Sequence, residues 1–249
     1  MNLSGNVDYL FIDGQRAVEY ERFDGEPPNA NEVRLLMPLA EALPVILEKF
    51  SGWMVAPVTD TLADALVAAG AVQLRHSAMM RRTLVAGHQP PESTFDYRIE
   101  PVVGHQEAMA ELSVRAYPAS HPDHEATDPA VALPDIQGLV DGSMIGPLLE
   151  SSSGVALGPT GVVIAACLIN RMPYDNLTGG GPWVSEIFRD PSDRHRGLGQ
   201  DLLQWSMRAL SLAGEETLGL AVTVGNPARG LYERLGFEVL AERRKLQLP

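Results

Sequence analysis

Residues 226–237 read Asn-Pro-Ala-Arg-Gly-Leu-Tyr-Glu-Arg-Leu-Gly-Phe, and they contain signals for both ends of a short helix. Asn226 is a good N-cap, and Pro227 suits the first helical position, where its missing N–H is not needed. Gly236 can take the left-handed conformation that ends a helix. The stretch therefore predicts one short, tightly bounded helix.

The side chains of this helix divide between a core face and its edge. Leu231 and Leu235 are four residues apart, so they share one face and should be core. Tyr232 is turned about 100° from Leu231 and should lie at the edge of that face. Its phenol is either a reactive group or a half-buried packing group with its hydroxyl in water.

A second segment upstream reads as a strand, a turn, a glycine-rich loop and a helix. The strand is expected from Trp183 to Pro191, and the helix begins near Leu198 with its apolar residues on one side. Gly197 and Gly199 let the backbone come close to a bound group, and the free N–H groups of the helix start point at the same loop. Such a helix end binds anions.

Basic side chains crowd this loop in a chain whose formal net charge is −13. They are Arg189, Arg194, His195 and Arg196. A cluster of basic side chains in an otherwise acidic chain calls for a local explanation, and the binding of an anionic ligand at this loop is one. An ordinary strand-to-helix connection is the alternative, but it does not explain why this loop and the downstream helix occur together.

Taken together, Arg194-x-x-Gly197-x-Gly199 and the Leu-Tyr232-Glu-Arg-Leu-Gly-Phe helix closely resemble the GNAT superfamily of acetyl-CoA-dependent N-acetyltransferases. The resemblance covers residues 95–249. It implies an α/β GNAT fold, in which a mixed, splayed central sheet is flanked by helices. It also implies transfer of an acetyl group from acetyl-CoA to a primary amine of a small molecule or a peptide N-terminus. A CoA-binding regulatory or scaffolding module without turnover is the alternative.

The resemblance also implies where acetyl-CoA binds. The pyrophosphate is expected on the backbone N–H groups of residues 195–200, and the pantetheine amides on the backbone of residues 187–189. Asn226 is expected to orient the cofactor or an ordered water, although its capping role alone would justify its presence. No metal is expected. The cofactor-binding set is Ile187, Phe188, Arg189, Arg194, His195, Arg196, Gly197, Leu198, Gly199, Gln200 and Asn226.

Arg189 departs from the family pattern, because an aliphatic residue usually stands two before the proline. Its side chain is expected to face solvent or to reach a phosphate.

Tyr232 is the expected general acid, because a phenol of pKa about 10 is matched to a departing thiol of pKa about 8.5. A base is also needed, since the incoming amine is mostly ammonium at neutral pH. Glu186 is the best candidate, but strand alternation allows it either face, and a structural charge pair is the alternative. His121, His124 or a water chain are the other candidates.

The N-terminal part of the chain repeats the pattern of the motif helix. Residues 58–70 align with residues 224–236, with Gly70 at the place of Gly236 and Leu66 at the place of Tyr232. Nothing before this copy resembles the glycine-rich loop. We interpret residues 1–90 as a degenerate GNAT-like half in a tandem repeat, and 95–249 as the catalytic domain. The alternative is that any strand-helix-strand unit would align as well.

Local patterns predict the elements around these motifs. Strands are expected at 7–12 and 16–23 around an Asp13-Gly14 hairpin turn, and helices at 31–50 and 134–149. Residues 88–95 are expected to be a linker. The polar, proline-rich stretch at 117–133 is expected to be a lid on the substrate side. A metal at His121 and His124 is disfavoured, because a loop gives no fixed geometry.

Composition limits the function classes. With 45% hydrophobic and 20% charged residues, the chain should be a globular protein with a proper core. Its 19 Lys and Arg against 32 acids argue against nucleic acid, and no apolar run is long enough for a signal peptide or a membrane span. We expect a cytoplasmic monomer or homodimer. Cys167 is expected to be a buried, reduced thiol.

Overall fold

The computed structural model describes residues 6–87, 96–124, 126–174, 178–192 and 196–249. The predicted linker at 88–95 lies outside the described residues. The chain forms two compact units. The N-terminal unit contains the residues up to 78 together with 241–249, and the main unit contains residues 79–240. The unit boundaries fall within β5 (Val72–Thr83) and β11 (Glu238–Gln247), so both strands contribute to both units.

In the N-terminal unit, strands pair in the order β1-β2-β3-β4-β11-β5. Its remaining elements are β1 (Asn6–Ile12), β2 (Gln15–Phe23), β3 (Asn29–Leu35), α1 (Leu39–Lys49), β4 (Met54–Pro57) and α2 (Asp60–Ala68). The predicted hairpin is confirmed, since Asp13 and Gly14 both have positive φ between β1 and β2. The helix predicted from residue 31 is wrong for its first part, which is β3.

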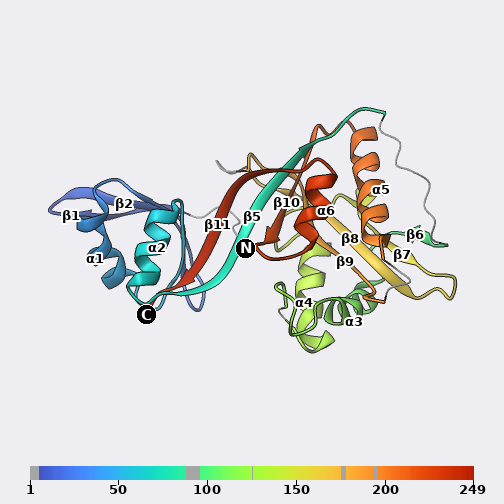
Figure 1. Cartoon of the computed structure of the whole chain (residues 1–249), viewed down its shortest axis with the longest axis horizontal. Helices are drawn as coiled ribbons and strands as arrows, with labels where there is room; N and C mark the ends of the chain where they lie inside the picture. Colours follow the sequence, from blue (N-terminus) through green and yellow to red (C-terminus); the bar gives the residue numbers. More distant parts are fainter. Residues whose placement is uncertain (1–5, 88–95, 125, 175–177, 193–195) are drawn as a thin grey trace. The chain divides into compact units, whose positions relative to one another are not determined.

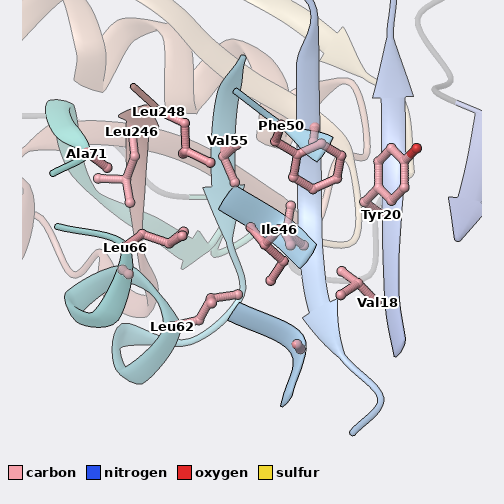
Figure 2. Packing of buried hydrophobic residues seen from close by; sticks show 14 of the residues in the cluster. Val18, Tyr20, Ile46, Phe50, Val55, Leu62, Leu66, Ala71, Leu246 and Leu248 are labelled. Atoms are coloured by element: carbon pink, nitrogen blue, oxygen red, sulfur yellow. The ribbon is translucent and has the colours of Figure 1, made fainter. Parts of the chain in front are cut away.

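The core of the N-terminal unit lies between its helices and its strands (Figure 2). Ile46 of α1 and Leu66 of α2 are fully buried there. Leu246 and Leu248, from the end of the chain, belong to the same core. Leu66, which aligns with Tyr232, is therefore a packing residue in a core.

The main unit has a mixed sheet with strand order β5-β10-β9-β8-β7-β6 (Figure 1). β8 and β9 are antiparallel, whereas β9 and β10 are parallel. The predicted α/β architecture with a mixed sheet is confirmed. The further elements are β6 (Arg98–Glu100), α3 (Gln106–Ala116), α4 (Pro129–Val140), η1 (Glu150–Ser152), β7 (Gly154–Leu157), β8 (Val163–Met172), β9 (Gly181–Arg189), α5 (Leu198–Leu212), β10 (Thr217–Thr223) and α6 (Ala228–Arg234).

Helices cover both faces of this sheet. α3 and α4 pack side by side, and their apolar residues form one core with Leu168 of β8 and Phe188 of β9 (Figure 1). Cys167 precedes Leu168 in the strand and so points to the opposite face, where its thiol meets Ser206 of α5. The sheet is thus enclosed between the α3–α4 pair and α5.

Candidate active site

The parallel strands β9 and β10 pair only at their beginnings. The paired positions are Trp183 with Gly219 and Val184 with Leu220. Beyond them β9 continues to Arg189 against β8, and β10 continues to Thr223, without further pairing between the two. The strands therefore splay apart, and the backbone of residues 185–189 has an edge that β10 does not occupy.

A β-bulge lies where the splay begins. Glu186 pairs with Leu168 and Val184 pairs with Ile169, so Ser185 is the extra residue of β9. The Ser185 hydroxyl donates to Oδ1 of Asn170 over 2.7 Å, and Asn170 is fully buried. This buried bond holds the bulge in place.

Glu186 lies on the α3–α4 face of the sheet. It is two residues before Phe188, whose ring is in the core that those helices cover. The Tyr117 hydroxyl, at the end of α3, lies 3.1 Å from Oε2 of Glu186 and 3.0 Å from the Ile187 carbonyl oxygen, and its one proton is shared between these two acceptors. Burial, and then the Glu186 carboxylate, raise the pKa of Tyr117 well above its usual value. Tyr117 is therefore a protonated donor to β9.

Tyr232 is more buried than its predicted place at the edge of a helix face. It is 8% exposed, whereas Leu231, the predicted core residue, is half-buried. Its ring meets Phe237 at 6.0 Å between centroids. In the part of the chain that the structure describes, its hydroxyl makes no hydrogen bond. Burial, followed by nearby Cys167, Asp123 and Glu186, raises the pKa of this phenol.

The start of α6 is held by Asn226, as predicted, although the helix begins one residue later than expected. Oδ1 of Asn226 accepts from the N–H of Ala228 over 2.8 Å. At the other end Gly236 has φ +81° and Phe237 donates its N–H to the Tyr232 carbonyl, which confirms the predicted left-handed end. The amide nitrogen of Asn226 donates to Oδ2 of Asp123 over 2.6 Å.

Both histidines of the predicted lid are engaged in local hydrogen bonds. Nδ1 of His124 donates to the Tyr117 carbonyl over 2.7 Å, because a carbonyl can only accept. Nδ1 of His121 accepts from the N–H of Asp123 over 3.1 Å. Among the described residues, no group of three or more His, Cys, Asp or Glu is placed to hold a metal.

The glycine-rich loop enters α5 through a backbone that only glycine adopts readily. Gly197 has φ +102° and, as a glycine, brings no side chain of its own to cap the helix start. The first N–H groups of α5 point toward this loop. A Cβ at Gly199 would meet open space. Arg194 and His195 lie outside the described residues, and Arg196 is exposed.

The other predicted cofactor residues offer mainly their backbone. The side chains of Phe188 and Leu198 are buried, and those of Ile187 and Gln200 are half-buried. Arg189 turns toward its own loop, because its Nη1 donates to the carbonyls of Asp190 over 2.5 Å and Ser192 over 3.2 Å. Its side chain thus organises the turn after β9.

Cys167 is a buried free thiol, as predicted, and burial raises its pKa to about 12.

Among the helices of the described residues, none is both long and apolar enough to cross a membrane.

Comparison with known proteins gives one family model and several similar structures. Residues 156–239 match the model described as acetyltransferase (GNAT) domain. No curated protein sequence matches the chain at a significant level. A GCN5-related N-acetyltransferase from Sphaerobacter thermophilus has a TM-score of 0.59 at 16% identity, covering 94% of this chain and 76% of that one.

Two more solved structures agree. A GCN5-related N-acetyltransferase from Kribbella flavida has a TM-score of 0.54 at 18% identity, covering 99% of this chain and 90% of that one. An acetyltransferase of the GNAT family from Colwellia psychrerythraea has a TM-score of 0.58 at 11% identity, with 98% and 86% covered. At these identities the likeness shows the fold, and the fold is the predicted one.

Proposed function

We propose that this chain, whose residues 156–239 match the GNAT acetyltransferase domain, moves the acetyl group of acetyl-CoA directly to a primary amine. The observation that supports this most is the splay of β9 and β10, with Glu186 on one strand and Tyr232 on the helix that follows the other. An acceptor and a thioester entering this gap would meet both side chains.

Acetyl-CoA would bind along the free edge of β9 and at the start of α5. Residues 187–189 offer backbone groups to the pantetheine amides, and their N–H groups can hold the thioester oxygen as it becomes negative. The diphosphate would lie on the backbone of residues 195–200, with Arg194 or Arg196 adding charge-assisted bonds. Asn226 has its oxygen on Ala228 and one amide hydrogen on Asp123, which leaves its second amide hydrogen for the cofactor or a water.

Tyr232 would act as the general acid. The amine attacks the thioester carbon to form the tetrahedral intermediate, and the C–S bond breaks as the phenol gives its proton to the departing sulfur. The extra proton on the product nitrogen passes to solvent, from which the phenolate is reprotonated. Burial keeps the resting phenol protonated because it raises its pKa. The positive nitrogen of the intermediate would offset the effect of the neighbouring carboxylates and make the phenol a better donor.

Glu186 would take a proton from the incoming ammonium. Its carboxylate is oriented by the Tyr117 hydroxyl over 3.1 Å, on the same face as the lid residues. His121 is a weaker candidate for the base, because its Nδ1 already accepts from the N–H of Asp123. His124 donates from Nδ1, so its unprotonated Nε2 is an alternative base.

Purified protein with acetyl-CoA and a panel of amines and peptides should release free CoA thiol. In Tyr232→Phe we expect kcat to fall about 100-fold or more with the KM for acetyl-CoA little changed, because general acids contribute about 10²–10⁴-fold. Tyr174→Phe removes a phenol that is 78% exposed and serves as the control. Unchanged turnover in Tyr232→Phe would remove Tyr232 from this role. Binding of acetyl-CoA without thiol release under any condition would favour a CoA-binding module.

A further inference from the structure

Because β9 and β10 splay apart, the sheet does not fix the distance between the two sides of the gap between them. Glu186 lies on β9 after pairing with β10 has stopped, and Tyr232 lies on α6, nine residues beyond the end of β10 at Thr223. Acid–base chemistry needs donor and acceptor held within hydrogen-bond reach of the reacting atoms. Some other part of the molecule must therefore fix the position of one edge relative to the other.

Residues 117–124, which we call the strap, contact both edges. At one end Tyr117 binds the Glu186 carboxylate and the Ile187 carbonyl of β9. At the other end the Asp123 carboxylate accepts from the Thr223 hydroxyl at the end of β10 and from the Asn226 amide before α6. These partners are 69 and 103 residues away along the chain, so the strap is a long-range link.

The strap is braced within itself. His124 donates to the Tyr117 carbonyl, and the N–H of Asp123 donates to the His121 ring. The His121 ring lies 4.9 Å from that of Tyr117 between centroids, and its backbone N–H donates to the Pro118 carbonyl. These internal hydrogen bonds make the strap rigid, so the distance between its two ends is fixed.

Asn226 connects the strap to the phenol. Its oxygen accepts the N–H of Ala228, the first residue of α6, and Tyr232 follows one turn later. α6 has only seven residues, so its direction depends strongly on how its first turn is held. Asp123 is 19% exposed at its side chain and fixes the Asn226 amide through its second oxygen.

We propose that Asp123 is a positioning residue: by holding Thr223 and Asn226 to the strap, it sets the place of Tyr232 opposite Glu186. This role rests on the proposed transfer reaction. Asp123 acts through Asn226 and α6, and the strap sets the width of the gap for catalysis.

The test is a charge-swapped pair. Asp123→Asn alone replaces one of the two acceptor oxygens with an amide donor, so only one of Thr223 and Asn226 keeps its acceptor, and Asn226→Asp alone sets carboxylate against carboxylate. We expect each to lower kcat about 10-fold or more, because misplacing a catalytic group by an ångström can cost about 100-fold. In the double variant the amide at 123 donates to the carboxylate at 226, which still accepts from Ala228. We expect it to regain kcat to within about 3-fold of the parent chain.

Asp141→Asn is the matched control. Asp141 follows α4, is exposed, and accepts from the N–H of Ser143 over 2.8 Å. The same change of a carboxylate to an amide at this position should leave kcat unchanged. The KM for acetyl-CoA should change much less than kcat in Asp123→Asn, because most of the groups that would hold the cofactor are backbone groups of β9 and α5.

Hydrogen exchange separates this role from the transfer reaction itself. In Asp123→Asn the amides of residues 226–237 should exchange faster than in the parent chain, and the double variant should restore them. If the parent chain releases no thiol with any amine, the proposed function fails, and exchange alone decides whether Asp123 holds α6. Unchanged exchange in α6, or a double variant that folds but does not regain its lost kcat or protection, would overturn the role of Asp123.

Discussion

Among single residues, Tyr232 links the site to the stability of the fold. Burial, with Cys167, Asp123 and Glu186 nearby, raises the pKa of its phenol above the ordinary value of about 10. The folded chain then keeps this proton at pH values where the unfolded chain releases it. The stability that Tyr232 provides is therefore complete below about pH 10 and is lost as the pH rises further.

Tyr232→Phe should accordingly make the free energy of unfolding less sensitive to alkaline pH. Between about pH 10 and pH 11, the parent chain should lose up to about 1.4 kcal/mol per pH unit more than the variant. Urea unfolding at a series of pH values measures this slope. Equal slopes for the parent chain and Tyr232→Phe would contradict a raised pKa of the Tyr232 phenol.

Local sequence patterns found Tyr232, Asn226 and Gly236, because a cap, a phenol and a terminal glycine lie within one short helix. Tyr117 and Asp123 were missed as contributors to the site. Their partners are far away in the chain, and no spacing rule relates residues that meet only through the sheet. The one local hint was a polar, proline-rich stretch after a helix.

Among the elements, α5 offers a test of where the diphosphate binds. Gly197 has φ +102°, so any side chain there strains the backbone, but Gly199 lies within the helix and a Cβ on it meets open space. Gly199→Asp adds a carboxylate to the first turn, which favours the helix by about 0.3–1 kcal/mol. The same charge should repel a diphosphate and raise the Kd of acetyl-CoA about 10-fold or more.

Calorimetric titration with acetyl-CoA measures this Kd, and thermal unfolding should show no loss of stability. Gly199→Asn has nearly the same size without the charge and should weaken binding much less. Equal affinity in Gly199→Asp and the parent chain would place the diphosphate elsewhere.

Element boundaries were harder to predict than the elements themselves. The helix predicted at 134–149 is α4 at 129–140, because Asp128 caps an earlier start and Gly142, with φ +79°, follows its end. Residues 31–35 had helical spacing, but they pair with β2 as part of β3. Helical spacing within one segment does not report pairing with a neighbouring strand, and the helix starts only after Pro38.

For the whole molecule, the two compact units cut across the predicted ranges of 1–90 and 95–249. The end of β11 pairs with β4, where Leu246 lies opposite Val55, and Leu248 donates its N–H to the Trp53 carbonyl. Repeat analysis compares segments in order along the chain, so it cannot assign the last residues to the first unit. A degenerate GNAT-like origin of that unit stays a prediction.

The last strand provides the final prediction, because it contains two leucines in opposite environments. Leu246 is fully buried in the N-terminal core, whereas Leu240 is 45% exposed. Leu246→Ala leaves a cavity and should lower the stability of the N-terminal unit by about 2–5 kcal/mol, while Leu240→Ala should change it by less than about 1 kcal/mol. Native-state hydrogen exchange of peptides from 15–35 and 53–57 reports on this unit separately. If residues 1–90 form a self-sufficient half, the amides of these peptides will be equally protected from exchange in the two variants. The C-terminal strand would then be dispensable to that core.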